Sequence, residues 1–167
     1  MSFAGLRVRP MRPADLARVI ALAESLMEAP HWTPAAWLTA LDAQSTPRRI
    51  ALVAAEEKSG AIRGFLVASL LPPQAELETI VVAEGARRLG VGRRLFAETV
   101  MEMKLAGVQE VWLEVRASNR PARGFYRALG FAETGWRTGY YADPIEDAVL
   151  MGMRLSEPPA EGGSESR

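Results

Sequence analysis

The chain has 167 residues, a length that suits one folded domain around one hydrophobic core. It carries 20 acidic and 20 basic residues, and this balance argues against nucleic acid or an anionic membrane as a partner held by bulk charge. The absence of cysteine excludes disulfides, thiolate metal sites and an acyl-cysteine intermediate, and a single histidine, His31, excludes a histidine metal cluster.

Hydrophobic spacing and turn residues divide the chain into short strands and helices. In chain order we predict a strand at 6–9, a helix from 13 to about 27, a helix from 34 to about 41, strands at 49–56, 61–71 and 76–82, a helix at 93–106, a strand at 110–116, a helix from 119 to about 129, and strands at 131–137 and 148–155. A loop at 140–147 joins the last two strands.

This order predicts a single α/β domain, residues 1–155, with a mixed, mostly antiparallel central sheet flanked by helices. Residues 156–167 are mainly Pro, Gly, Ser and Glu, so we expect a disordered tail. The N-terminus lacks a signal-peptide pattern, and no stretch approaches the ~20 apolar residues of a membrane helix. We therefore expect a cytoplasmic protein with no metal, no membrane and no nucleic acid among its partners.

The stretch Arg87–Gly92, which reads Arg-Arg-Leu-Gly-Val-Gly, lies between a predicted strand and a predicted helix. A helix N-terminus leaves about four backbone N–H groups unpaired and carries partial positive charge, and glycine allows a ligand to approach that backbone closely. Arg93 and Arg94 add further positive charge. The pattern therefore favours a pyrophosphate site, with a tight strand-to-helix turn as the simpler alternative.

Two commoner phosphate loops do not fit this stretch. A P-loop needs Lys-Ser or Lys-Thr directly after Gly90, where the chain has Val91 and Gly92. A dinucleotide-binding fingerprint needs a third small residue where the chain has Leu95.

The pattern Arg87-x-x-Gly90-x-Gly92 resembles the Gln/Arg-x-x-Gly-x-Gly/Ala motif of the GNAT acetyltransferases. Within that family, residues 112–119 (WLEVRASN) and 125–131 (FYRALGF) are similar to the ribosomal-protein-alanine acetyltransferases, RimI. The resemblance covers about residues 8–155 and is strongest from Ile80 onward. It implies a GNAT fold, acetyl-CoA as co-substrate, and transfer of acetyl to an amine, most specifically the N-terminal α-amine of a protein or peptide such as a ribosomal protein.

The same resemblance implies which residues bind acetyl-CoA. The backbone of Ile80, Val81 and Val82 would bind the acetyl and pantetheine part, and Asn119 would hydrogen-bond the cofactor. The residues implied to surround the pyrophosphate are Arg87, Arg88, Leu89, Gly90, Val91, Gly92 and Arg93.

Glu114 and Tyr126 are implied as the general base and the general acid. A protein α-amine has a pKa near ~8 and attacks a thioester only after it has lost its proton, so a carboxylate base suits the reaction. A tyrosine with a pKa near ~10 is protonated at neutral pH and can protonate the leaving thiolate. No nucleophilic residue is needed, so we expect direct attack in a ternary complex. Without the motif, a solvent-facing Glu114 and a core Tyr126 would be the ordinary interpretations.

The acceptor amine is less well defined by the sequence. Trp32, Tyr140 and Tyr141 are the candidates to line its groove, and the carboxylates that could bind a positive peptide end are Asp143, Glu146 and Asp147. His31 and the pair 83–84 depart from the residues common in the family, near the loops that would shape this groove. A small-molecule amine or lysine acetyltransferase and a non-catalytic acetyl-CoA-binding module therefore remain as alternatives.

Overall fold

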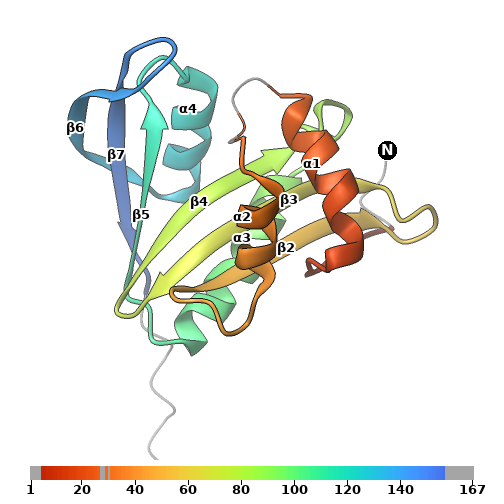
Figure 1. Cartoon of the computed structure of the whole chain (residues 1–167). Helices are drawn as coiled ribbons and strands as arrows, with labels where there is room; N and C mark the ends of the chain where they lie inside the picture. The colour runs from red at the N-terminus through yellow and green to blue at the C-terminus, as the bar shows by residue number, and fades with distance from the viewer. Residues whose placement is uncertain (1–4, 27–28, 30, 157–167) are drawn as a thin grey trace, which may run out of the picture.

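The computed structural model describes residues 5–26, 29 and 31–156, so the predicted tail at 157–167 lies outside the described residues. Figure 1 shows a central sheet with helices on both sides. The strands are β1 (Leu6–Pro10), β2 (Arg48–Glu56), β3 (Ile62–Leu71), β4 (Gln74–Val82), β5 (Glu110–Arg116), β6 (Ala132–Tyr141) and β7 (Glu146–Arg154). The helices are α1 (Leu16–Glu24), α2 (Pro34–Leu41), α3 (Val91–Leu105) and α4 (Arg120–Leu129). The predicted fold class and element order are confirmed.

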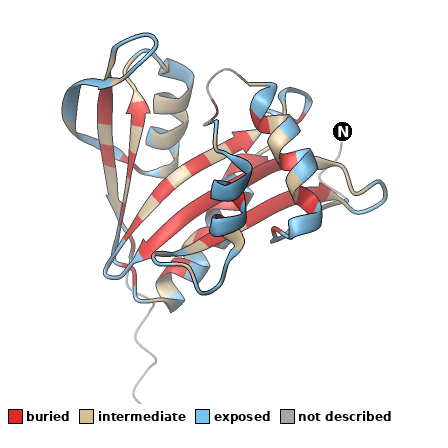
Figure 2. Ribbon diagram, viewed as in Figure 1, coloured by how far each residue is buried: buried red, intermediate tan, exposed pale blue. Residues whose placement is uncertain are grey.

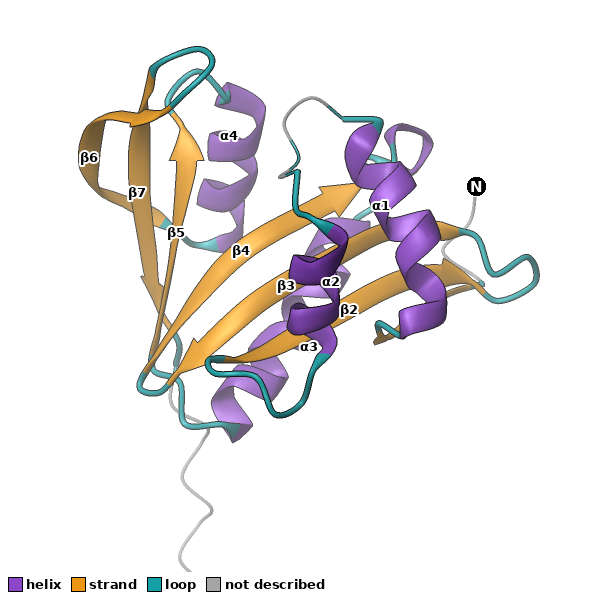
Figure 3. Cartoon of the chain, viewed as in Figure 1, coloured by secondary structure: helices purple, strands orange, loops and turns teal. Residues whose placement is uncertain are grey.

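The seven strands form one sheet in the order β1-β2-β3-β4-β5-β7-β6. Every neighbouring pair is antiparallel except β4 and β5, which run parallel. This parallel pair is also the shortest, because it joins only residues 74–76 of β4 to residues 110–112 of β5. Beyond that point the two strands diverge, as Figure 3 shows, and the sheet splits into a V.

Both faces of the sheet are covered, and strand alternation divides the core into two clusters. On one face α1 and α2 pack over β2 and β3, with Trp37 and Phe65 among the buried residues. On the other face α3 and α4 pack against side chains such as Leu66, Leu113 and Met151. Figure 2 shows that β2 and β3 are mostly buried, whereas β6, at the end of the sheet, is exposed along most of its length.

Capping residues set the helix ends much as predicted. The Thr33 side chain accepts a hydrogen bond from Ala36 N–H, and Gly130 ends α4 with a φ of 112°. Two helices differ from the prediction at their ends. The first is α1, which runs from Leu16 to Glu24 after a 3-10 turn at Pro13–Asp15, rather than from 13 to about 27. The second is α3, which begins at Val91 rather than Arg93. In the described part of the chain no helix is long and apolar enough to cross a bilayer.

The predicted loop at 140–147 is wrong at both ends. Tyr140 and Tyr141 belong to β6, Glu146 and Asp147 belong to β7, and Tyr141 pairs with Glu146. The connection is therefore only residues 142–145. Acidic residues and Pro144 made this stretch look like a loop, but it belongs to an irregular hairpin. Sequence patterns do not report the cross-strand pairing of such a hairpin.

Candidate active site

The split between β4 and β5 exposes one edge of β4. Ala83 N–H donates to the Arg63 carbonyl of β3 at 2.8 Å, so this backbone position faces β3. Backbone polar groups of successive strand residues point to alternate edges. The Val82 and Ile80 backbones therefore face the side from which β5 has moved away, whereas Val81 uses its backbone within the sheet. Two of the three residues predicted to bind the acetyl and pantetheine part thus present N–H groups to the opening.

The loop that follows β4 leads into the N-terminus of α3 with two residues in the left-handed region, Arg88 at φ 64° and Gly90 at φ 75°. Arg94 N–H donates to the Gly90 carbonyl at 3.0 Å, so the N–H groups of residues 91–93 have no acceptor within the helix. Together with the helix dipole, these N–H groups form an anion-binding site of the kind that suits a pyrophosphate.

Side chains of this loop separate into anchors and an exposed positive rim. Val91 is buried and Leu89 packs against the same core cluster, which fixes the loop to the sheet. Arg87, Arg88 and Arg93 are exposed at the loop surface. The loop therefore holds its backbone rigidly and leaves positive charge available outside it.

Gly92 permits a close approach between α3 and α4. A Cβ atom at this position would lie 2.9 Å from Phe125 Cζ and 3.5 Å from Val82 Cγ2. The absent side chain therefore makes room first for the Phe125 ring of α4, beside the edge of β4. The sequence indicated two other reasons for this glycine, close approach of a pyrophosphate and a tight strand-to-helix turn, but not the contact with Phe125.

Glu114 lies on the face of β5 opposite the α3–α4 core, as the alternation along 110–116 predicted. Its side chain is 10% exposed, and its Oε1 atom lies 3.3 Å from NH1 of Arg137. Interaction of the Tyr140 hydroxyl with the same carboxylate raises the pKa of Tyr140. Glu114 is thus a shielded carboxylate held by two residues of β6, rather than a solvent-facing strand residue.

Tyr126 projects from α4 against aromatic neighbours, with ring centroids 5.6 Å from Phe125 and 5.9 Å from Phe131. Burial, followed by the nearby Tyr141, raises the pKa of Tyr126 to about 12. Burial and then the charge of Glu114 raise the pKa of Tyr141, also to about 12. Tyr141 therefore lies between the predicted base and the predicted acid, and both phenols stay protonated at neutral pH.

Two carboxylates of β4 that the sequence analysis did not single out share this region. Burial, followed by the charges of Glu78 and Glu114, raises the pKa of Glu76. Glu78 forms an ion pair with Arg49 of β2, at 2.8 Å between Oε2 and Nε. The Glu-Leu-Glu alternation on the strand before the glycine loop was the available signal, since it puts both carboxylates on one face.

Trp32 lines a hollow of about 200 Å³ together with Ala36, Arg49 and Glu78. The Trp32 ring also lies 4.7 Å from that of Trp37, which is fully buried, so one side of Trp32 is anchored to the core. This predicted acceptor residue therefore lies at an opening on the α1–α2 face of the sheet, the face that also carries Glu114.

Three residues predicted to bind a ligand make contacts within the fold. Asn119 Oδ1 accepts from Ala122 N–H at 3.1 Å and caps α4. Glu146 accepts from Ser118 N–H at 2.6 Å, and Asp147 Oδ1 accepts from Gly139 N–H at 2.9 Å. Glu146 and Asp147 are therefore engaged within the fold rather than presented to a peptide, because the segment that carries them is strand and not loop.

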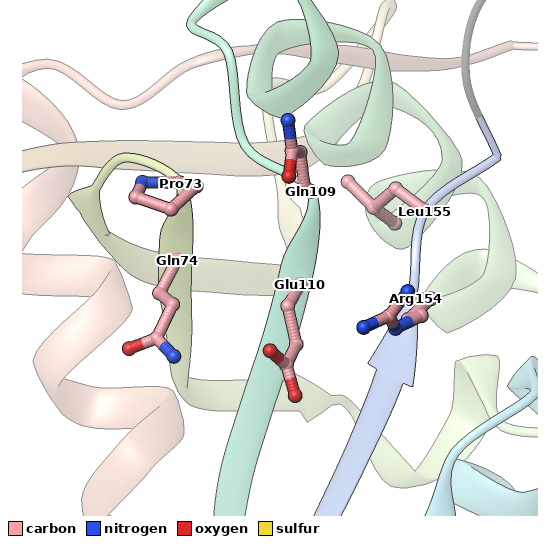
Figure 4. Close-up of a pocket in the computed structure, with 6 residues that line it drawn as sticks. All are labelled: Pro73, Gln74, Gln109, Glu110, Arg154 and Leu155. Atoms are coloured by element: carbon pink, nitrogen blue, oxygen red, sulfur yellow. The ribbon is translucent and has the colours of Figure 1, made fainter.

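A second hollow of about 200 Å³ lies where β4, β5 and β7 meet. Figure 4 shows Gln74, Glu110 and Arg154 side by side on these three strands, with Pro73, Gln109 and Leu155 beside them. This is the closed end of the V, four residues along β5 from Glu114, so it is not part of the site described above.

The features of this site suit the binding of a CoA thioester. The unpaired edge of β4 offers N–H groups to an amide-rich arm, and the α3 N-terminus offers N–H groups to a pyrophosphate. Glu114 lies on β5 beyond the last residue that pairs with β4, and Tyr126 lies on α4. Within residues 5–26, 29 and 31–156, no three His, Asp or Glu residues come together so as to hold a metal ion.

Fold and site together define an acyltransferase that takes its acyl group from a CoA thioester. A model of the Acetyltransferase (GNAT) family matches residues 17–131, and the chain belongs to this family. It is an acetyl-CoA-dependent N-acetyltransferase, as the family and its named relatives show.

The relatives specify the branch of the family. The chain is 37% identical over 101 residues to the [ribosomal protein bS18]-alanine N-acetyltransferase of Escherichia coli (strain K12), covering 59% of this chain and 68% of the relative. It is 31% identical over 150 residues to a Bacillus subtilis (strain 168) protein that bears the same name provisionally, covering 90% and 96%. The structure superimposes on the crystal structure of the ribosomal-protein-S18-alanine N-acetyltransferase from Escherichia coli with a TM-score of 0.77 at 26% identity. The superposition covers 93% of this chain and 97% of that chain. The resemblance to RimI is confirmed.

Proposed function

We propose that this protein acetylates the N-terminal α-amine of a protein, with an N-terminal alanine of a ribosomal protein as the best-supported acceptor. One relationship supports the proposal: beyond the short pairing of β4 with β5, the charge of Glu114 raises the pKa of Tyr141 and Tyr141 in turn raises the pKa of Tyr126, so the proposed base and the proposed acid share a neighbour. The names of the relatives support the choice of a protein N-terminus over other amines.

Acetyl-CoA supplies an activated thioester carbonyl when bound in this opening. Glu114 takes the proton from the acceptor amine, directly or through water, so that the amine nitrogen forms a bond to the carbonyl carbon. The Val82 N–H stabilises the charge that develops on the carbonyl oxygen. Tyr126 donates its phenolic proton to the sulfur as the carbon–sulfur bond breaks. The second proton that leaves the nitrogen passes through solvent to the Tyr126 phenolate, Glu114 releases the first proton to solvent, and the products are an N-acetyl amide and a free thiol.

The α1–α2 face supplies the acceptor side of this proposal. Trp32 offers an apolar surface at the hollow. Two carboxylates lie nearby: Glu78, which is paired with Arg49, and Glu76, which lies close enough to Glu78 and Glu114 to feel both charges. A protonated α-amine is attracted into such a region before it loses its proton. Tyr140, which contacts Glu114, borders the opposite side.

The test is an acetyl-transfer assay read by mass spectrometry, with fragmentation to locate the added acetyl group. The acceptors are a peptide that begins with alanine and contains one internal lysine, the same peptide with a blocked N-terminus, and a polyamine. We expect acetylation of the free α-amine only. Preferential acetylation of the internal lysine, seen in the blocked peptide, would instead support a lysine acetyltransferase. Preferential acetylation of the polyamine would support a small-molecule amine acetyltransferase. Binding of acetyl-CoA with no transfer to any amine would overturn the enzymatic proposal.

A further inference from the structure

The strand β6 departs from regular pairing next to the carboxylate that the proposed function uses as its base. Arg137 pairs with Ala148 and Tyr141 pairs with Glu146, so three residues of β6, 138–140, lie opposite the single residue Asp147 of β7. Bulges of this kind bend a strand and turn side chains that would otherwise alternate between faces.

The bulge brings together two side chains that a regular strand would separate. Arg137 and Tyr140 are three residues apart, so regular alternation would place them on opposite faces of the sheet. Instead the Arg137 guanidinium carbon lies 5.4 Å from the Tyr140 ring centroid, and both side chains contact Glu114. The irregularity is therefore what permits two residues of β6 to hold one carboxylate of β5.

Gly139 and Asp147 define the conformation of this bulge. Gly139 has a φ of 62°, a backbone conformation that side chains other than Asn and Asp rarely adopt, and its N–H donates to Asp147 Oδ1 at 2.9 Å. A Cβ atom at Gly139 would meet only Ile145 Cγ2, at 3.8 Å, which is ordinary contact. The glycine therefore serves backbone conformation rather than space.

We propose that Asp147 is a positioning residue for acetyl transfer: by holding Gly139 in the left-handed region it turns Tyr140 onto Glu114 beside Arg137, and so fixes the carboxylate that receives the proton of the acceptor amine. The proposal rests on the proposed role of Glu114. It gives Asp147 a structural task in place of the contact with a peptide that the sequence suggested.

The groups that face Glu114 can be followed separately. They are Arg137, Tyr140 and Tyr141 from β6 and Glu76 from β4. The chain has only three tyrosines, Tyr126, Tyr140 and Tyr141, and all three lie at the site. Carbon-13 labelling at tyrosine Cζ therefore gives one signal for each, assigned with Tyr140→Phe and Tyr141→Phe, and reports the interaction of Tyr140 with Glu114 without any measurement of activity.

The experiment compares Asp147→Ala, which removes the acceptor for Gly139 N–H, with Asp147→Asn, which keeps an Oδ1 acceptor. Asp42→Ala is the matched control, because Asp42 Oδ1 also accepts a backbone N–H at 2.9 Å, from Gln44, in the loop after α2. In Asp147→Ala we expect the pKa of Tyr140 to fall toward its ordinary value and the other two tyrosines to keep theirs. We expect kcat to drop about ten- to a hundredfold with little change in the affinity for acetyl-CoA.

Asp147→Asn should behave as the wild type in both measurements, and Asp42→Ala should leave the Tyr140 titration and kcat unchanged. An unchanged Tyr140 titration in Asp147→Ala would overturn the positioning proposal, and so would an altered titration with wild-type kcat. Loss of activity together with a lower affinity for acetyl-CoA would show general disruption of the fold and would also overturn it. The role of Glu114 itself is tested by Glu114→Gln, so failure there is distinguishable from failure here.

Discussion

Arg137 on β6 and Glu114 on β5 form an ion pair at 3.3 Å although β7 lies between their strands. The arginine reaches across β7 at Ala148, its direct pairing partner, whose side chain is a single buried methyl group. A larger residue at 148 would stand in the path of the guanidinium. The carboxylate of Glu114 is thus held from the far edge of the sheet, while its other side faces the opening between β4 and β5.

Replacing Glu114 by Gln removes the proposed proton acceptor but keeps the shape of the side chain. We expect kcat to fall by about 10²- to 10⁴-fold, the usual contribution of a general base, while the affinity for acetyl-CoA stays near that of the wild type. Steady-state kinetics and calorimetry with acetyl-CoA measure the two quantities. A variant that kept wild-type kcat would remove Glu114 from the mechanism.

Glu110→Gln is the matched control for this prediction. Glu110 lies on the same strand and the same face, four residues or about 13 Å away, at the closed end of the V. It lines the hollow shown in Figure 4 and has no place in the proposed transfer. The change removes the same charge from β5, so its kcat should match that of the wild type.

Tyr126→Phe keeps the ring that packs against Phe131 and removes only the hydroxyl. We expect kcat to fall about 10²-fold and the melting temperature to stay near that of the wild type. Because burial raises the pKa of Tyr126 to about 12, the phenol is fully protonated below that pH and remains a competent acid throughout the neutral and mildly alkaline range. The wild-type rate should therefore not fall with rising pH below about pH 10. A fall in that range which Tyr126→Phe abolished would contradict the assignment.

Much of this arrangement was predictable because it is local. Alternation along 110–116 placed Glu114 opposite the core face, and the change from strand to glycine-rich turn at Gly90 marked the start of α3. Thr33 and Gly130 marked helix ends through side-chain and backbone preferences that act within a few residues.

The contacts around the carboxylate were not predictable in the same way. Arg137 meets Glu114 only because of strand order and the bulge of β6, which depend on pairing between residues distant in the sequence. The raised pKa of Glu76 likewise follows from its burial, and then from the charges of Glu78 and Glu114, once the strands are in place. Sequence spacing reports which residues share a face, but not which strands diverge.

Gly92→Ala tests the close approach of α4 to α3. The new methyl group would lie 2.9 Å from Phe125 Cζ, so the ring must move, and such overpacking costs about 1–3 kcal/mol of the free energy of unfolding. Because Phe125 borders the opening at Val82, we also expect weaker binding of acetyl-CoA. Chemical denaturation and calorimetry measure these two effects.

Two further variants distinguish a clash with Phe125 from a clash with the ligand as the cause of these losses. Adding Phe125→Leu to Gly92→Ala should restore part of both losses, since the smaller side chain leaves room for the methyl group. Gly85→Ala, in the same connection, should change neither quantity, because its Cβ would have no heavy atom within 4 Å. If the double variant bound acetyl-CoA as weakly as Gly92→Ala alone, the contact with the ligand rather than with Phe125 would explain the glycine.

The pair between Arg9 and Asp15 predicts how stability depends on pH. Asp15 accepts from Arg9 at 2.7 and 2.8 Å and from Arg12 N–H at 2.8 Å, and its side chain is 9% exposed. The hydrogen bonds from Arg9 hold the pKa of Asp15 below its usual range, against the opposing effect of burial. As pH falls, Asp15 is therefore protonated at a higher pH in the unfolded chain than in the folded chain. The stability that the ionised Asp15 contributes is complete above the unfolded pKa of about 3.9 and is lost as pH falls through the lower folded pKa.

Asp15→Asn should therefore lower the free energy of unfolding by about 1–3 kcal/mol at neutral pH, because it leaves the poorly exposed Arg9 guanidinium without its carboxylate. The difference from the wild type should shrink as pH falls below about 4, since the wild type loses the same contribution there. Urea denaturation at a series of pH values measures both. Glu56→Gln, which breaks the more exposed pair with Arg63, should have the smaller effect at every pH. Equal losses in the two variants, or a difference for Asp15→Asn that persisted unchanged into acid, would show that the Arg9–Asp15 pair does not stabilise the start of α1 through its charge.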